Sequence, residues 1–145
     1  MEQKITWMHC LIFGISIFIL LSFSKCGDVD YRVRADFIYI NETVHTIEII
    51  SEKPFTLPPN SDYVIKIDSD GGKNISADSY VPPFSDGIVI YDDIKCDTLA
   101  SGAILGQGEG PAGIQNYQSK KISDRYYEFT YRFTEDHFLL AEECN

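Results

Sequence analysis

The chain has 145 residues, with 22 Asp and Glu against 12 Lys and Arg, so its formal net charge is −10 at neutral pH. A domain this acidic repels nucleic acid and anionic lipid surfaces, and we expect no nucleic-acid partner. The length suffices for one hydrophobic core, because domains commonly span about 100–150 residues.

Residues 1–25 have the layout of a secretory signal. Lys4 supplies a positive charge, residues 11–23 are mainly apolar, and small serines stand at positions 22 and 24. Cys26 follows directly, and the composition then turns polar with Gly, Asp, Val and Asp. This pattern predicts an exported protein.

Three fates of this N-terminus are open. In the first, Cys26 becomes the lipid-modified first residue of the mature chain, and in the second, signal peptidase cuts after Ser24. In the third, nothing cuts, and residues 5–24 stay as an anchor across an apolar layer of about 30 Å. Cysteine parity favours the first fate. Lipid on Cys26 and loss of Cys10 with the signal leave two cysteines, an even number for an oxidising compartment.

Two parts of the chain resemble small lipoproteins of Bacteroidetes. One is the segment Leu-Ser-Phe-Ser-Lys-Cys at residues 21–26, with the acidic run that follows it. The other is the string Tyr-Glu-Phe-Thr-Tyr-Arg-Phe-Thr at 127–134, together with the positions of Cys96 and Cys144. These features are similar to a family of such lipoproteins that has no known activity, and the similarity covers most of the chain.

The resemblance implies lipid attachment at Cys26, an acidic tether at residues 26–31, and a lipid-anchored place in the outer membrane. In that group, acidic residues after the lipidated cysteine are associated with passage to the outer surface; the alternative is a periplasmic location. Triplets such as Asp-Thr-Leu at 97–99 are glycosylation acceptors in the same group, which implies Thr98 as a site of O-glycosylation.

The first strand is predicted at residues 32–39, where apolar and charged side chains alternate. Its inward face carries Val33, Ala35, Phe37 and Tyr39. Residues 43–51 resume the alternation, and we expect the two segments to pair as a hairpin. Prolines at positions 54, 58 and 59 cannot donate to a ladder, so residues 53–60 are expected to form a sheet edge or a crossover.

The next strand is predicted at residues 63–68, with Tyr63, Ile65 and Ile67 facing inward. A run of turn-forming residues at 68–72 is expected to end it. The carboxylates of that turn do not match the ligand spacing of a calcium loop, so we expect no metal there.

Residues 73–86 are expected to form a polar loop, and residues 87–92 a strand that leads into an Asp-Asp turn. Residues 101–113 hold five glycines, and 108–113 match G-x-G-x-x-G. That motif binds phosphate only between a strand and a helix, and residues 114–122 show an extended pattern instead. We therefore expect a flexible loop.

The clearest pattern in the chain is at residues 125–133, which predicts a central strand. Aromatic side chains at Tyr127, Phe129, Tyr131 and Phe133 share one face, and Tyr126, Glu128, Thr130 and Arg132 share the other. Thr134 is a good helix N-cap, and Glu135 and Asp136 suit a first turn. The short helix is expected to end at Cys144 and to face inward with Phe138, Leu139 and Ala141.

Patterns typical of catalysis are weak. His45 and His137 lack partners at zinc-ligand spacing and are predicted to be surface residues. The sequence has no G-x-S-x-G nucleophile motif. We therefore assign no catalytic residue, no metal and no cofactor. Cys96 and Cys144 do not have the spacing of a redox pair and are predicted to form a structural disulfide.

Together these patterns predict that residues 32–145 form a single all-β domain, an immunoglobulin-like β-sandwich with a short C-terminal helix. The expected function is binding or adhesion, with a glycan or another envelope protein as partner. The tyrosines proposed as exposed contacts are Tyr80, Tyr91 and Tyr126. The alternative is a small exported hydrolase or enzyme inhibitor. A concave pocket with converging titratable groups favours an enzyme, and a flat tyrosine-rich sheet face favours binding.

Overall fold

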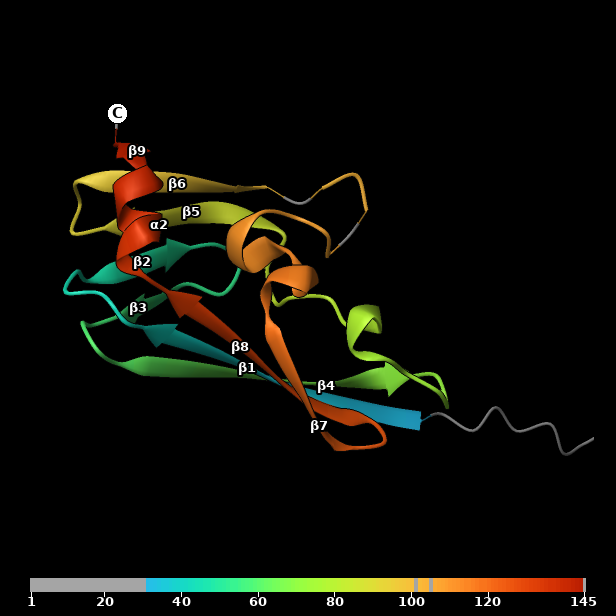
Figure 1. The fold of residues 1–145 in the computed structure, drawn as a ribbon. Helices are drawn as coiled ribbons and strands as arrows, with labels where there is room; N and C mark the ends of the chain where they lie inside the picture. The colour runs from blue at the N-terminus through green and yellow to red at the C-terminus, as the bar shows by residue number, and fades with distance from the viewer. Residues whose placement is uncertain (1–30, 101, 105, 145) are drawn as a thin grey trace, which may run out of the picture. The chain divides into compact units, whose positions relative to one another are not determined.

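The computed structural model describes residues 31–100, 102–104 and 106–144. Cys26 and the predicted signal lie outside the described residues. The described chain forms short 3₁₀ turns (η), strands and one α-helix (Figure 1). Their order is β1 Tyr31–Asn41, β2 Ile47–Ile50, β3 Phe55–Leu57, β4 Asp62–Gly71, η1 Ala77–Ser79, β5 Asp86–Tyr91, β6 Lys95–Ala100, η2 Gly110–Ala112, η3 Ile114–Asn116, β7 Gln118–Ser123, β8 Tyr126–Phe133, α2 Glu135–Leu140 and β9 Glu142–Glu143.

The strands form two sheets that enclose one core. The first sheet has the order β4-β1-β8-β7, and the second has the order β3-β2-β5-β6-β9. Their buried side chains meet between the sheets; the ring of Tyr39, for example, lies 5.1 Å from that of Phe55. The prediction of an all-β, sandwich-like fold with a short C-terminal helix is confirmed at this level.

β8 is the central strand that the sequence predicts. It lies between β7 and β1, antiparallel to the first and parallel to the second. Its four inward aromatic side chains are all buried, and the inward face of β1 is buried as predicted. Across the parallel pair, the rings of Phe37 and Phe129 stack with centroids 5.0 Å apart. Strict alternation identified both strands because successive side chains of a strand point to opposite faces.

The predicted hairpin between β1 and β2 is wrong, because the two strands belong to different sheets. The chain changes sheets at Asn41, whose buried side chain donates to the carbonyls of His45, Leu57 and Pro58 at 2.8–3.1 Å. The Asn41 Oδ1 atom accepts hydrogen bonds from the backbone N–H and the hydroxyl of Thr43. These bonds satisfy the polar groups of a corner that is buried. The turn of a hairpin would instead leave such groups exposed to water.

β3 is an edge strand, one of the two arrangements that the prolines around it predict. The predicted turn at 68–72 is wrong, because β4 continues to Gly71 and pairs with residues 31–40 of β1. A Cβ atom on Gly71 would lie 2.6 Å from Val33, so the glycine is what allows this close approach. Tyr63, predicted to face inward, is 42% exposed and stacks on the edge residue Phe55.

Much of the segment 106–113 is buried, with Gln107 and Glu109 exposed, and the prediction of a flexible loop is corrected for it. Pro111 and Ala112 in η2 are buried. The hydroxyl of Tyr117 donates to the Pro111 carbonyl at 2.7 Å and lies 3.1 Å from the hydroxyl of Tyr39. Burial raises the pKa of Tyr39 and of Tyr117, so both phenols stay neutral and hold this contact. The segment predicted as extended from residue 114 begins with η3 before β7 starts.

α2 begins after Thr134, whose backbone N–H donates to the Nδ1 atom of His137 at 3.0 Å. Phe138 is half-buried and Ala141 is buried, as predicted. Leu139 is 67% exposed, so its predicted inward orientation is wrong. The helix also ends earlier than expected, because the chain turns into β9 and pairs with β6. Within the described ranges, no helix is long and apolar enough to cross a membrane.

Cys96 and Cys144 form the predicted disulfide, with their Cα atoms 5.0 Å apart. The bond joins β6 to the residue that follows β9, and the backbone N–H of Cys144 also donates to the carbonyl of Ile94 at 3.0 Å. The C-terminal segment is therefore held to the second sheet by a covalent bond and by strand pairing.

Candidate functional site

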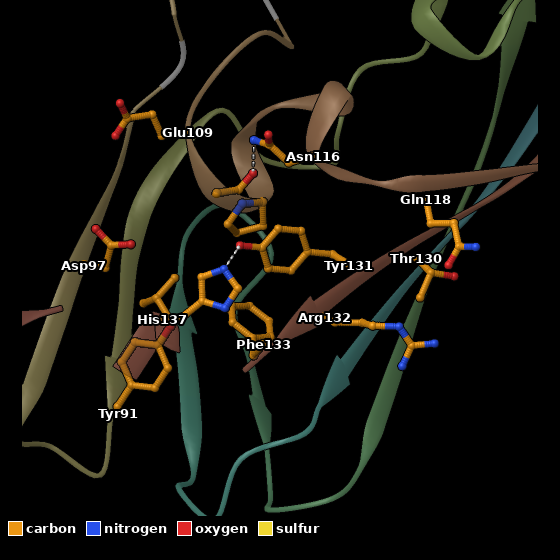
Figure 2. A pocket seen from close by; sticks show the side chains of 13 residues that line it. Tyr91, Asp97, Glu109, Asn116, Gln118, Thr130, Tyr131, Arg132, Phe133 and His137 are labelled. Carbon is orange, nitrogen blue, oxygen red and sulfur yellow. Dashed lines mark hydrogen bonds between the residues drawn. The ribbon is translucent and has the colours of Figure 1, made fainter. Parts of the chain in front are cut away.

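A pocket with a volume of about 480 Å³ opens where the end of β8 meets β5, β6 and α2. β7 begins opposite Thr130, so residues 131–133 of β8 have no strand on that side. Figure 2 shows acidic side chains on one side of the pocket and Arg132 on the other. Its thirteen lining residues are Val89, Tyr91, Asp97, Glu109, Gly110, Pro111, Asn116, Gln118, Thr130, Tyr131, Arg132, Phe133 and His137.

The centre of the pocket is formed by His137 and Tyr131. The Nε2 atom of His137 lies 3.4 Å from the hydroxyl of Tyr131. Because the Nδ1 atom accepts the backbone N–H of Thr134, the tautomer that fits carries its hydrogen on Nε2. Burial raises the pKa of Tyr131 to about 12, so its hydroxyl is neutral at physiological pH. The pair therefore offers both donors and acceptors to a ligand.

Two carboxylates, Asp97 of β6 and Glu109 before η2, form the acidic side of the pocket. Partial burial and then the negative charge of Glu109 raise the pKa of Asp97. The loop that carries Glu109 is held by Asn116, whose amide donates to the carbonyls of Gly108 and Gly110 at 3.1 and 2.8 Å. A hydrogen-bond donor on a ligand would satisfy both carboxylates and reduce their mutual repulsion.

The lining combines hydrogen-bonding groups of both kinds with apolar and aromatic surface. Donors come from Gln118 and from Arg132, which also pairs with Glu42, and acceptors come from the carboxylates and amide oxygens. Tyr91 and Phe133 supply aromatic surface. A volume of this size is within the usual range of small-ligand sites, about 300–1,000 Å³. None of the thirteen lining residues is Ser, Cys or Lys.

The three tyrosines proposed as ligand contacts lie in different places. Tyr80 and Tyr91 are buried, with 8% and 1% of their surface exposed, so the prediction that they are exposed is wrong. The Tyr80 hydroxyl donates to the carbonyl of Arg125, and Tyr91 faces inward on β5 with the same parity as Val89. Of the three, the pocket contains Tyr91 alone.

Tyr126 is half-buried on the outer face of the first sheet. Its hydroxyl donates to the Oδ2 atom of Asp36 at 2.9 Å, and the guanidinium of Arg34 lies 5.1 Å from its ring. Thr98 is exposed on β6, next to the buried Leu99. Its glycosylation stays a prediction.

His45 joins three segments of the fold. Its Nδ1 atom is 2.7 Å from Asp92, its Nε2 atom is 3.5 Å from Glu135, and its ring stacks on Phe138. The hydrogen bonds from His45 and from the backbone N–H of Thr46 lower the pKa of Asp92. With a carboxylate at each ring nitrogen, His45 is positioned as a structural contact. Across the described ranges, no group of three His, Cys, Asp or Glu side chains is arranged to hold a metal ion.

Most of the pocket could not be predicted from the sequence. His137 was predicted to lie on the surface, and Asp97, Asn116 and Arg132 had no predicted part in a binding site. These residues come from β6, η3, β8 and α2 and share no local spacing, so no sequence motif marks them. The local signal near the pocket was the glycine-rich segment 108–113, which contains Glu109 and does not have the context of a phosphate-binding loop. No protein-family model, no curated protein and no solved structure matches the chain.

Proposed function

We propose that this protein is an exported binding module that holds a polar ligand, a sugar unit of a glycan, in the pocket at the end of β8. The observation that supports it is the lining itself, in which donors, acceptors and aromatic surface converge. Sugars present hydroxyl groups that donate and accept at once, together with apolar ring faces. An exposed side chain of an envelope protein offers similar chemistry and is the second kind of partner.

Binding is favoured over catalysis by how the titratable groups are arranged. A catalytic nucleophile is normally hydrogen-bonded to its base, which is in turn oriented by a third group. Among the thirteen lining residues, one hydrogen bond joins two titratable side chains. It links Tyr131 to His137 and is long, at 3.4 Å. A concave pocket with converging titratable side chains is the feature expected of an enzyme, so it is the lack of such a hydrogen-bonded set among these lining residues that favours binding.

The ligand proposal predicts that Asp97→Asn and Glu109→Gln each weaken binding by about tenfold, because hydrogen bonds to charged groups contribute about 1.5–3 kcal/mol. The measurement is a titration of the full-length protein in detergent with mono- and oligosaccharides, followed by NMR chemical shifts. Glu52→Gln is the matched control, since Glu52 is an exposed carboxylate between β2 and β3. Shifts that appear away from the pocket, or equal affinities for all variants, would contradict the proposal.

A second candidate is hydrolysis of a glycosidic bond, and one observation favours it. Burial, and then the negative charge of Glu109, raise the pKa of Asp97, and glycoside cleavage uses two carboxyl groups of which the general acid has a raised pKa. Incubation with the same oligosaccharides distinguishes the two functions. Release of new reducing ends that both Asp97→Asn and Glu109→Gln abolish would replace the binding proposal with an enzyme.

We also propose that Cys26 is lipidated and that the protein is anchored in the outer membrane. The disulfide supports this, because it uses Cys96 and Cys144 and leaves Cys26 available for lipid. Metabolic labelling with a fatty-acid analogue is expected to mark the protein in producing cells, and Cys26→Ser is expected to abolish the label. Cys10→Ser serves as the control. Label that survives in the Cys26→Ser variant would rule out this attachment site.

We also propose that the fold is immunoglobulin-like in outline. The two sheets that enclose the core support this classification. The disulfide differs from that of true immunoglobulin domains, since Cys96 and Cys144 connect neighbouring parts of one sheet instead of bridging two sheets.

A further inference from the structure

The end of the domain where β1 begins is formed by three segments, the start of β1, the turn between β7 and β8, and the loop before η1. In Figure 1 this end lies away from α2 and the C-terminus. Two adjoining depressions cover it, with volumes of about 700 and 440 Å³, and they share Asp124 and Arg125. We call this surface the basic face.

The basic face departs from the overall charge of the chain. Of the 12 Lys and Arg in a protein with net charge −10, five line these two depressions, against one acidic lining residue, Asp124, and two flanking ones, Asp68 and Asp70. The five are Arg32, Arg34, Lys73, Lys121 and Arg125. The sequence-based expectation that this protein repels anionic lipid therefore holds for the domain as a whole and not for this surface.

Two arginines of the basic face are held by aromatic rings. The guanidinium of Arg125 lies 4.6 Å from the ring of Tyr31, and that of Arg34 lies 5.1 Å from the ring of Tyr126. Stacking orients the planar group and leaves its N–H donors able to reach an anion. Within the described ranges, the ion pairs of this face involve Lys121 with Asp124 and Arg32 with Asp68 and Asp70, and none involves Arg34 or Arg125.

We propose that the basic face docks on the phosphate headgroups of the membrane in which the protein is anchored. This inference rests on the proposed lipid at Cys26. Four residues lie between Cys26 and Tyr31, and the five Cα-to-Cα steps from one to the other span at most about 18 Å. The tether therefore keeps the basic face, of which Tyr31 is part, close to the headgroups, while the acidic remainder of the domain is repelled. In this orientation α2 and the pocket beside it face away from the membrane.

The test uses the full-length protein, isolated from producing cells and reconstituted into two kinds of vesicle, phosphatidylcholine alone or phosphatidylcholine with phosphatidylglycerol. Hydrogen exchange is followed for the backbone amides of residues 73–79 and 123–126. We expect about tenfold slower exchange in the vesicles with phosphatidylglycerol, and loss of this protection at high salt, because screening weakens exposed charge interactions. Equal exchange rates in both vesicles would overturn the proposal.

A pair of charge-reversal variants makes the test specific. Lys73→Glu with Lys121→Glu is expected to remove most of the protection, whereas Lys53→Glu with Lys66→Glu, which changes the net charge equally at exposed sites elsewhere, is expected to retain it. Equal losses in both pairs would show a general charge effect and overturn docking by the basic face. The fatty-acid label on Cys26 is scored separately, so failure of the anchor and failure of the docking surface give different results.

Discussion

Replacing Phe129 by Ala is expected to lower the free energy of unfolding by about 3–5 kcal/mol. Phe129 is fully buried in the central strand β8, and its ring packs against Phe37 of β1 and Tyr80 before β5, at 5.0 and 5.2 Å between centroids. The substitution removes a large apolar side chain and leaves a cavity that close-packed neighbours fill only in part. A loss of this size is a large fraction of the stability of a domain of this length.

Thr130→Ala is the matched control, because Thr130 is the next residue of the same strand and points to the opposite, half-exposed face. Its substitution is expected to cost less than about 1 kcal/mol. Urea denaturation of both variants, followed by circular dichroism, measures the two values. Similar losses for Phe129→Ala and Thr130→Ala would mean that β8 does not form the centre of the core.

Replacing both Cys96 and Cys144 by Ser is expected to lower the free energy of unfolding by about 2–4 kcal/mol. The disulfide joins residues that are 48 positions apart in the sequence, so the intact bond restricts the unfolded chain over a long loop. In the folded state it holds β9, a strand of two residues, against β6. Without the bond, β9 is held by its short pairing with β6, and its backbone amides are expected to exchange faster.

Non-reducing peptide mapping first establishes that the two cysteines are bonded in the isolated protein, and urea denaturation then gives the difference in stability. Cys26→Ser, which leaves the disulfide intact, is the control for removing a cysteine. Recovery of Cys96 and Cys144 as free thiols in folded protein would contradict this prediction, as would equal stability of the double variant.

The sequence by itself determined the parts of the fold that depend on local alternation and on special residues. β1 and β8 were predicted with the correct inward faces because their side chains alternate strictly, which is a property of the strand alone. Prolines around Phe55–Leu57 indicated a sheet edge or a crossover because proline lacks a backbone donor, and the structure has an edge strand there. The disulfide was predictable because Cys96 and Cys144 were the pair left once Cys26 and Cys10 were assigned to the N-terminus.

Only the tertiary structure decided which strands pair and what covers each face. β1 and β2 are adjacent in the sequence yet lie in different sheets, since the buried Asn41 corner and the parallel partner β8 outweigh a local hairpin. Tyr91 looks like an exposed strand end in the sequence but is covered by other elements. The pocket was invisible for the same reason. Its lining comes from segments far apart in the chain, and their convergence depends on where β7 starts and where α2 packs, which no local pattern encodes.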